Sequence, residues 1–278
     1  MALRAKPPTD RMGRLKCMIY GPAGEGKTTA AIQMPRPYII DTEGGCCHYS
    51  TTINSVGGAV FESNDIEDVI VEVRELAKGG HDYRTIVIDP FTPLYDVKTD
   101  EGADKVGTDF GRHYGYANTF CKRLFNVLSV IDMNVVVTCH AKREYGDGMQ
   151  VIGQTFDGWR KLDYAFDLVF ELKRVGAKRM AYVRKTRLEQ FSDQSSFEWS
   201  FDALASRYGG DLMTRQVEGV DFAGEAQVQE LRTLLANAPS DMGEWLSGCL
   251  RKAKVDCIEN LQTEQIGKMI DYLKNGAS

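Results

Sequence analysis

The stretch GPAGEGKTTA, residues 21–30, follows a short apolar run, LKCMIY, and precedes a segment of helical character. It fits the pattern G-x-x-x-x-G-K-[ST], with Gly21 and Gly26 at the glycine positions and Lys27 and Thr28 after them. Glycines let backbone N–H groups turn toward one centre, where they surround phosphate oxygens. The stretch therefore predicts a phosphate-binding loop between a strand and a helix.

A loop of this kind binds a nucleoside triphosphate together with Mg²⁺, so we expect ATP and Mg²⁺ as cofactors. Lys27 is expected to reach the β- and γ-phosphates, and the Thr28 hydroxyl to face the metal ion. The expected phosphate-binding residues are the whole run Gly21, Pro22, Ala23, Gly24, Glu25, Gly26, Lys27, Thr28 and Thr29.

Three further apolar runs end in polar residues. TIVIDP places Asp89 at the end of an apolar run, where a carboxylate is suited to hold Mg²⁺ through its water shell. PYIIDTEGG ends with Asp41 and Glu43, and we expect Glu43 to orient an attacking water. NVVVTCH ends in His140, a candidate for sensing the γ-phosphate and passing the signal to the segment that follows.

The order of these runs predicts an α/β fold. Apolar strands alternate with helical segments such as DIEDVIVEVRELAK, residues 65–78, so we expect a largely parallel central sheet flanked by helices. Residues 96–113 and 141–161 are expected to be polar loops. We divide the chain into a flexible N-terminal arm at 1–13, an ATPase core at 14–220 and a small helical C-terminal module at 224–278.

A basic hairpin is predicted from DLVFELKRV and KRMAYVRKTR, joined at residues 175–177. Residues 173–187 contain no acidic side chain, although the net charge of the whole chain is −5. Such a cluster suits either the γ-phosphate of a neighbouring subunit or the phosphates of DNA. Its cations are Lys173, Arg174, Lys178, Arg179, Arg184, Lys185 and Arg187.

Five features come in an order that resembles the RecA-like ATPase core. They are the phosphate loop, the D-T-E strand, the strand ending at Asp89, the strand ending at His140 and the basic hairpin. The order is most similar to that of the phage-encoded RecA-like recombination ATPases sometimes called Sak-type, which support single-strand annealing. The resemblance covers roughly residues 14–215. The D-T-E strand directly after the first helix is its more specific feature, because the phosphate loop is shared by many nucleotide-binding proteins.

The resemblance implies a DNA-stimulated ATPase that acts on single-stranded DNA as a homo-oligomer, a ring or a filament, with a single-strand binding protein as a possible partner. Glu43 matches the catalytic base, Asp89 the metal-binding aspartate, and His140 a position that usually holds glutamine. Lys185 and Arg187 match basic residues inserted into the next subunit's site. The loops that line the DNA path in the family hold, in this sequence, Lys142, Arg143, Tyr145, Arg160 and Lys161.

Other functions share these motifs. A hexameric helicase or helicase loader uses the same core, a P-loop small-molecule kinase needs an arginine-bearing lid that the hairpin resembles, and a nucleotide-dependent switch binds without turnover. The sequence shows no signal-peptide pattern and no apolar run near 18 residues, so we expect no membrane span and a cytoplasmic location, in the host cell if the chain is phage-encoded. Seven scattered cysteines without a C-x-x-C pair favour reduced thiols over a metal site.

Overall fold

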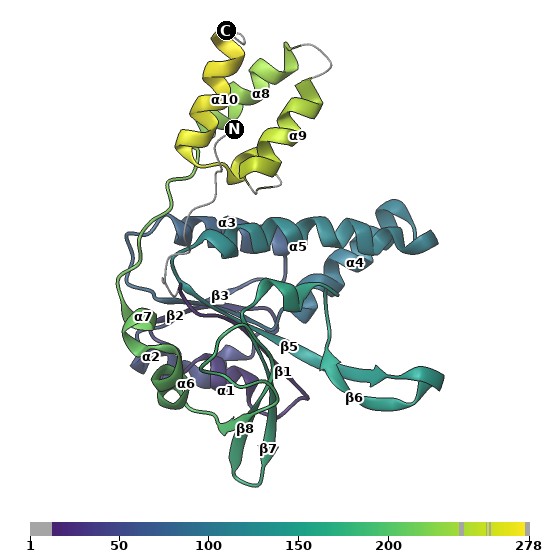
Figure 1. Cartoon of the computed structure of the whole chain (residues 1–278), viewed down its shortest axis with the longest axis vertical. Helices are drawn as coiled ribbons and strands as arrows, with labels where there is room; N and C mark the ends of the chain where they lie inside the picture. The colour runs from purple at the N-terminus through teal and green to yellow at the C-terminus, as the bar shows by residue number, and fades with distance from the viewer. Residues whose placement is uncertain (1–12, 239–241, 254, 256, 276–278) are drawn as a thin grey trace, which may run out of the picture.

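A nine-stranded sheet forms the centre of the chain, with helices on both faces (Figure 1). The computed structural model describes residues 13–238, 242–253, 255 and 257–275, so all of the predicted arm at 1–13 except Gly13 lies outside the described residues. The strand order is β3-β2-β4-β5-β1-β7-β8-β9, and β6 pairs with β5. Strands β3 to β7 along this path are parallel, whereas β8, β9 and β6 are antiparallel additions.

The central strands are apolar along most of their length because both of their faces are covered. All five residues of β4 are buried, as are the first six of β5. The strands are β1 (Lys16–Gly21), β2 (Pro37–Asp41), β3 (Ala59–Glu62), β4 (Thr85–Asp89), β5 (Asn134–Tyr145), β6 (Val151–Phe156), β7 (Leu168–Val175), β8 (Lys178–Thr186) and β9 (Ser196–Glu198).

Two groups of helices cover the sheet (Figure 1). On one face α3 (Ile66–Ala77), α4 (Thr92–Val106) and α5 (Arg112–Val130) enclose a core that includes Phe91 and Phe166. On the other face the helices are α1 (Lys27–Ala31), α2 (Ser50–Ser55), α6 (Phe201–Tyr208) and α7 (Gly210–Thr214). The predicted α/β fold with a mostly parallel sheet between helices is confirmed.

The prediction of a polar loop at 96–113 is wrong, because α4 occupies most of this segment and α5 begins at Arg112. The helix buries Leu94 and Tyr95, and its glycine allows a close approach to α5: a Cβ at Gly102 would lie 2.8 Å from the His113 carbonyl oxygen. Lys98 is buried between carboxylates, donating to Glu67 at 2.8 Å. Polar contacts thus replace the apolar stripe that sequence patterning would detect.

The prediction of a polar loop at 141–161 is also wrong over most of this segment. Strand β5 continues beyond the sheet to Tyr145 and pairs with β6, so residues 141–156 form a β-hairpin. The exposed half of β5 carries only scattered apolar residues. The two-residue alternation of a half-buried strand is therefore weak in this segment.

Three further helices follow the sheet: α8 (Glu225–Ala236), α9 (Met242–Ala253) and α10 (Thr263–Asn275). They lie beyond the α3 layer (Figure 1) and bury a core of their own, which includes Leu231, Leu261 and Ile266. The link to the sheet domain runs through Phe222, whose ring lies 5.5 Å from the Arg74 guanidinium carbon. The domain limits at 220 and 224 stay a prediction.

Candidate nucleotide site

The phosphate loop joins the end of β1 to α1. Gly24 and Gly26 have φ angles of 82° and 88°, which favour glycine and let the chain fold back on itself. Lys27 Nζ donates to the carbonyl oxygens of Gly21 and Pro22, each at 2.9 Å, so its ammonium group lies across the loop. Burial lowers the pKa of Lys27, and the carboxylates of Asp89 and Glu43 oppose this shift.

The sheet order brings the predicted polar residues to one edge. Parallel strands have their carboxyl ends together, and β4 lies between β2 and β5, with β1 on the far side of β5. Gly21 is paired with His140, and Asp41 with Asp89. The structure therefore assembles the phosphate loop and these strand ends side by side.

Asp89 lies against the start of the loop helix. Asp89 is 5% exposed, and its carboxylate accepts a hydrogen bond from the Thr138 hydroxyl and interacts with the Thr28 hydroxyl. A threonine hydroxyl and one carboxylate are ligands of the kind that Mg²⁺ uses when a nucleotide's phosphates supply the rest. Thr28 and Asp89 thus fit a magnesium site. Thr138 was not among the site residues predicted from the sequence. It follows Val137, which pairs with Ile88, and it therefore lies beside Asp89.

Burial raises the pKa of Asp89, with the two hydroxyls and Lys27 opposing the shift. A folded-state pKa above the unfolded value of 3.8 means that the ionised carboxylate lowers the stability of the fold at neutral pH, a penalty absent at low pH. We therefore expect Asp89→Asn to raise the thermal unfolding midpoint at pH 7.

This gain from Asp89→Asn should vanish as the pH falls through 3.8, since the wild-type carboxylate is then protonated in both states. Asp100→Asn, at an exposed position on α4, is the control and should leave the midpoint unchanged. A lower midpoint for Asp89→Asn at pH 7 would show that the hydroxyl contacts outweigh the cost of burial.

The turn after β2 holds Glu43 over the same edge. Asp41 is 3% exposed, and its carboxylate accepts hydrogen bonds from four backbone N–H groups, those of residues 43–46, at 2.7–3.2 Å. Asp41 therefore fixes the turn instead of facing the site. Glu43 is 48% exposed at its side chain, and its Oε1 lies 3.1 Å from Nε2 of His140.

A hydrogen bond of its backbone fixes the position of His140. Its backbone N–H donates to Thr92 Oγ1 at 3.0 Å, and that hydroxyl donates to the carbonyl oxygen of Asp157 at 2.8 Å. His140 also marks the point where β5 leaves the sheet and continues as the β5–β6 hairpin. A contact at Glu43 is thereby linked along one strand to Lys142 and the residues after it.

Lys185 and Arg187 lie at the opposite edge of the sheet from the phosphate loop of their own chain. Strand β8 runs antiparallel to β7, and Thr186 pairs with Leu168 at the start of β7. Lys185 Nζ donates to the Asp163 and Phe166 carbonyl oxygens, and Arg187 pairs with Asp167 at 3.1 Å. The structure does not bring these two residues to the site within one chain.

The start of β8 lies at the phosphate-loop edge, and Arg179 contacts the loop. A Cβ at Gly26 would come within 2.1 Å of Arg179 Nε. The sequence predicted Arg179 only as one cation of the basic hairpin. The pairing of Arg174 with Arg179, one pair before the turn, places it at the phosphate loop and cannot be read from the sequence.

The predicted DNA-binding residues separate into three places. Lys142 and Arg160 line a cavity of about 480 Å³ that Tyr95, Asp96 and Tyr114 also line. Arg143 and Tyr145 lie on the β5–β6 hairpin. Lys161 lines another cavity.

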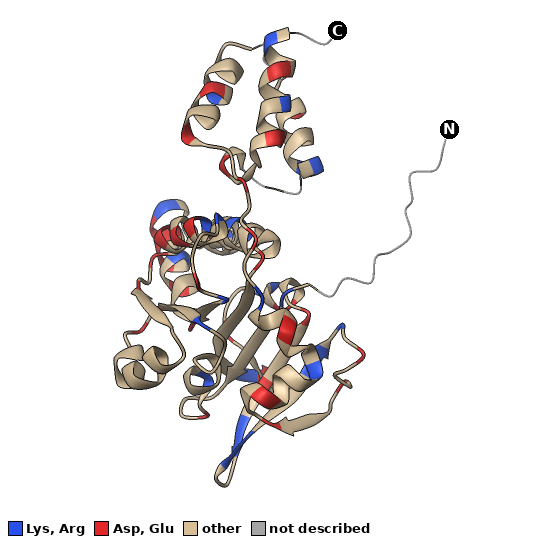
Figure 2. Ribbon diagram, turned by 90° about the vertical axis from the view of Figure 1, so that its left-hand side faces the viewer, with Lys and Arg blue, Asp and Glu red and all other residues tan. Residues whose placement is uncertain are grey.

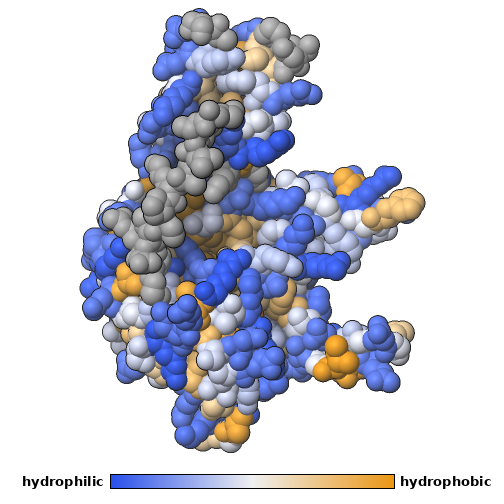
Figure 3. Space-filling view, viewed as in Figure 1, coloured by the Kyte–Doolittle hydropathy of each residue, from blue (hydrophilic) through white to orange (hydrophobic). Residues whose placement is uncertain are grey.

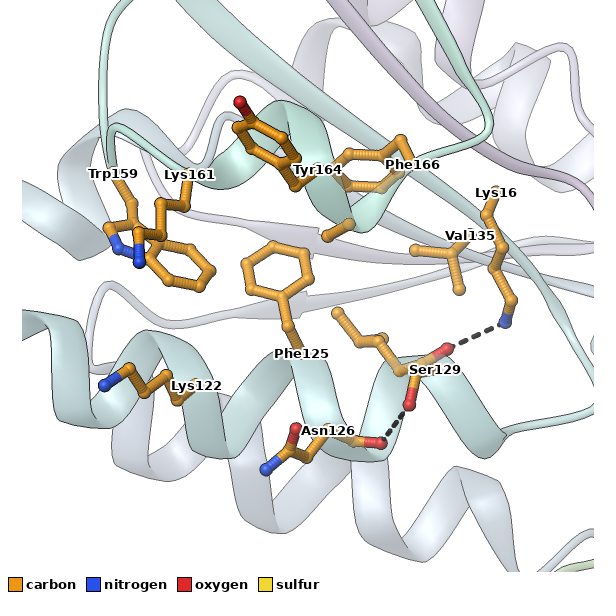
Figure 4. A pocket seen from close by; sticks show the side chains of 12 residues that line it. Lys16, Lys122, Phe125, Asn126, Ser129, Val135, Trp159, Lys161, Tyr164 and Phe166 are labelled. Atoms are coloured by element: carbon orange, nitrogen blue, oxygen red, sulfur yellow. Dashed lines mark hydrogen bonds between the residues drawn. The ribbon is translucent and has the colours of Figure 1, made fainter. Parts of the chain in front are cut away.

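This other cavity, of about 310 Å³, lies between α5 and residues 159–166 (Figure 4). Phe125, Trp159 and Phe166 form its apolar wall, and Lys16 lies at one end. Lys16 Nζ donates to three backbone carbonyl oxygens at 2.8–3.0 Å, of residues 128, 131 and 133. Its ammonium group therefore closes the carboxyl end of α5.

The profile of the AAA domain family matches residues 14–190, which include the phosphate loop and all of the strand ends described above. This chain belongs to the AAA domain family. The match ends three residues past Arg187, so this AAA domain also contains the basic hairpin.

Two solved structures are similar to this AAA domain protein. The RadB recombinase has a TM-score of 0.44 and 15% identity, over 74% of this chain and 90% of that one. A DnaB-like replicative helicase, solved to describe its interactions with primase, has a TM-score of 0.45 and 12% identity, over 68% of this chain and 56% of that one. No curated protein matches the sequence. Within the described ranges, no helix has both the length and the apolar character to cross a membrane.

Proposed function

We propose that this AAA domain protein hydrolyses ATP and that the reaction serves single-stranded DNA in recombination or strand annealing. The observation that carries the proposal is the placement of Glu43. Its carboxylate is half exposed, held by His140, and within electrostatic reach of Lys27 on the phosphate loop. A partly solvated carboxylate beside a phosphate site is suited to orient water.

The chain's own residues supply the chemistry. Backbone N–H groups of residues 21–28 and the Lys27 ammonium bind the phosphates, and Glu43 orients a water for in-line attack on the terminal one. Thr28 and Asp89 would hold Mg²⁺, which neutralises charge on the phosphates when bound. Glu43 accepts a proton from the attacking water as ADP leaves.

The link from His140 to the β5–β6 hairpin supports coupling between ATP and DNA. Glu43 contacts His140, and β5 is continuous from His140 to Tyr145. RecA-like proteins usually have a glutamine at this position. His140 replaces it in this chain, and its Nε2 lies within hydrogen-bonding distance of Glu43. We propose that His140 transmits the nucleotide state to the DNA path.

The DNA path that we propose runs over the Lys142–Arg160 cavity and the β5–β6 hairpin. Apolar side chains project from this hairpin and from the α4–α5 connection (Figure 3). Single-stranded DNA binds where stacking surfaces and phosphate-binding cations occur together. The exposed large side chains in these segments are Val106, Phe110, Tyr114, Tyr145, Met149, Val151 and Ile152.

The ATPase rate should rise severalfold with single-stranded DNA, and it should rise with protein concentration if subunits complete each other's sites. The measurement is phosphate release with and without an oligonucleotide, over a hundredfold range of protein concentration. A rate insensitive to both would remove DNA and assembly from the proposal. Unwinding of a duplex in the same conditions would instead identify a helicase.

Lys142→Ala combined with Arg160→Ala should abolish most of the stimulation by DNA, because both cations line one cavity next to the His140 strand. Lys161→Ala is the matched control, since Lys161 lines the separate cavity of Figure 4. It should keep the stimulation. Equal losses in the two proteins would move the DNA path away from the 480 Å³ cavity.

Oligomer formation gives Lys185 and Arg187 a function in the proposal. They lie at the edge opposite their own phosphate loop, so they would contribute to catalysis only at the site of an adjacent subunit.

The helices of 224–278 have a core of their own and are proposed as a docking module for a single-strand binding protein. A chain ending at residue 223 should then lose that partner in a pull-down and keep its ATPase activity; unchanged partner binding would end the docking proposal.

A further inference from the structure

The tip of the β7–β8 hairpin lies beside the phosphate loop. Strand β7 pairs in parallel with β1, with Tyr20 opposite Glu171, so β7 ends at the edge where the loop begins. The hairpin then turns at Gly176, and β8 starts at the same edge. Lysine and arginine positions, blue in Figure 2, follow this hairpin at the lower end of the molecule.

Three contacts join the hairpin to the loop within one chain. The position of a Cβ on Gly21 would be 2.6 Å from the Leu172 carbonyl oxygen, and Glu25 accepts a hydrogen bond from the backbone N–H of Arg174. The third contact is the Arg179 side chain on Gly26, where a Cβ would meet Nε at 2.1 Å and Cζ at 3.1 Å. The guanidinium group of Arg179 is therefore packed on the loop, at the residue before Lys27.

Four other cations of the hairpin have a carboxylate partner within the chain. Lys173 and Arg184 share the buried Glu171, Lys178 pairs with Glu198 at 2.7 Å, and Arg187 pairs with Asp167 at 3.1 Å. For Arg179, by contrast, the described part of the chain contains no salt bridge, and its buried Nε has no hydrogen-bond acceptor. The backbone is nevertheless fixed, because the Arg179 carbonyl oxygen accepts from the Trp199 N–H at 2.7 Å.

A buried N–H donor without an acceptor is unfavourable, and it is unusual in native structures. A guanidinium group without a carboxylate, placed on a loop built for phosphate, has a ready anion in the ligand of that loop. Arginine binds phosphate through two parallel N–H groups, and its side chain is long enough to turn from Gly26 toward the bound anion.

We propose that Arg179 is a phosphate-binding residue of its own chain's nucleotide site, a second cation beside Lys27 that acts in cis. This inference depends on the proposed function, because it assumes that the loop binds ATP. It differs from the proposed role of Lys185 and Arg187, which requires an adjacent subunit. It also assigns the two ends of β8 to two sites: Arg179 to the chain's own, and Lys185 to a neighbour's.

The test compares Arg179→Met, which keeps an unbranched side chain and removes the charge, with wild type. Titration calorimetry with a non-hydrolysable ATP analogue and Mg²⁺ should show about tenfold to a hundredfold weaker binding, the effect of losing hydrogen bonds from a charged group. Arg179→Lys should recover part of the loss. Lys178→Met is the matched control, since its ammonium pairs with Glu198, and it should bind as wild type does.

Arg179→Met with wild-type affinity would overturn the inference, and so would a loss of affinity equal to that of Lys178→Met. Thermal unfolding without nucleotide separates binding from folding, because replacing a buried guanidinium group that lacks a hydrogen-bond acceptor should not lower the midpoint. If the wild-type chain binds no analogue, the proposed function itself is refuted. If the wild-type chain binds the analogue and Arg179→Met binds it equally well, only the inference about Arg179 is refuted.

Mixing tests the cis assignment. An oligomer formed from a mixture of Arg179→Met and Lys27→Ala subunits contains no chain that has both Lys27 and Arg179. If Arg179 acts in cis, the ATPase rate of the mixture stays at the sum of its parts. A mixture that clearly exceeds this sum would place Arg179 at the neighbour's site and overturn the assignment.

Discussion

Glu43→Gln is expected to bind ATP about as tightly as wild type and to hydrolyse it about 10²–10⁴-fold more slowly, the usual contribution of a general base. The amide keeps the size of the side chain and can still contact His140, whose Nε2 lies 3.1 Å from Glu43 Oε1. It cannot accept a proton from water. Calorimetry gives the affinity, and phosphate release gives the rate.

Glu62→Gln is the matched control for Glu43→Gln. Glu62 ends β3, where it pairs with Asp41 one strand further from the phosphate loop, and its side chain is exposed. Its replacement should leave both binding and turnover unchanged. A Glu43→Gln protein that hydrolyses ATP at the wild-type rate would show that another group orients the water.

Lys27→Ala is expected to lose both functions: binding should weaken about tenfold or more, and turnover should fall about 10²–10³-fold, as it does when one preorganised donor to a developing charge is removed. Lys27 lies across the loop, and the carboxylates of Asp89 and Glu43 both raise its pKa against the effect of burial. Lys27→Arg should not restore turnover, because the planar guanidinium group is larger and directs its donors differently.

An unchanged thermal unfolding midpoint would show that Lys27→Ala is folded, since the lysine's two contacts are to carbonyl oxygens of its own loop. Turnover close to wild type in this folded protein would contradict the assignment of residues 21–28 as the phosphate site.

Much of the site could be predicted because its parts are local. The phosphate loop is one continuous stretch, and each other polar residue ends a continuous apolar strand, so parallel pairing alone brings Asp89 and His140 to the loop. The role of Asp41 was harder to predict, since an acidic strand end does not show whether a carboxylate faces the ligand or accepts the N–H groups of its own turn.

The remaining features depend on contacts between distant residues. Helix α4 is stabilised by the buried Lys98 with Glu67 and by the close approach at Gly102, which leave a weak apolar pattern in the sequence. The two ends of β8 face opposite edges of the sheet, and only the register of the hairpin shows that Arg179, not Lys185, contacts the chain's own loop.

The central claim is that residues 21–28 bind ATP with Mg²⁺, and the most direct measurement is titration calorimetry of the full chain. The account predicts saturable uptake of one ATP per chain that requires Mg²⁺ for full affinity and is lost or strongly weakened in Lys27→Ala. The absence of heat of binding with folded wild-type protein, at ATP concentrations up to several millimolar, would contradict it.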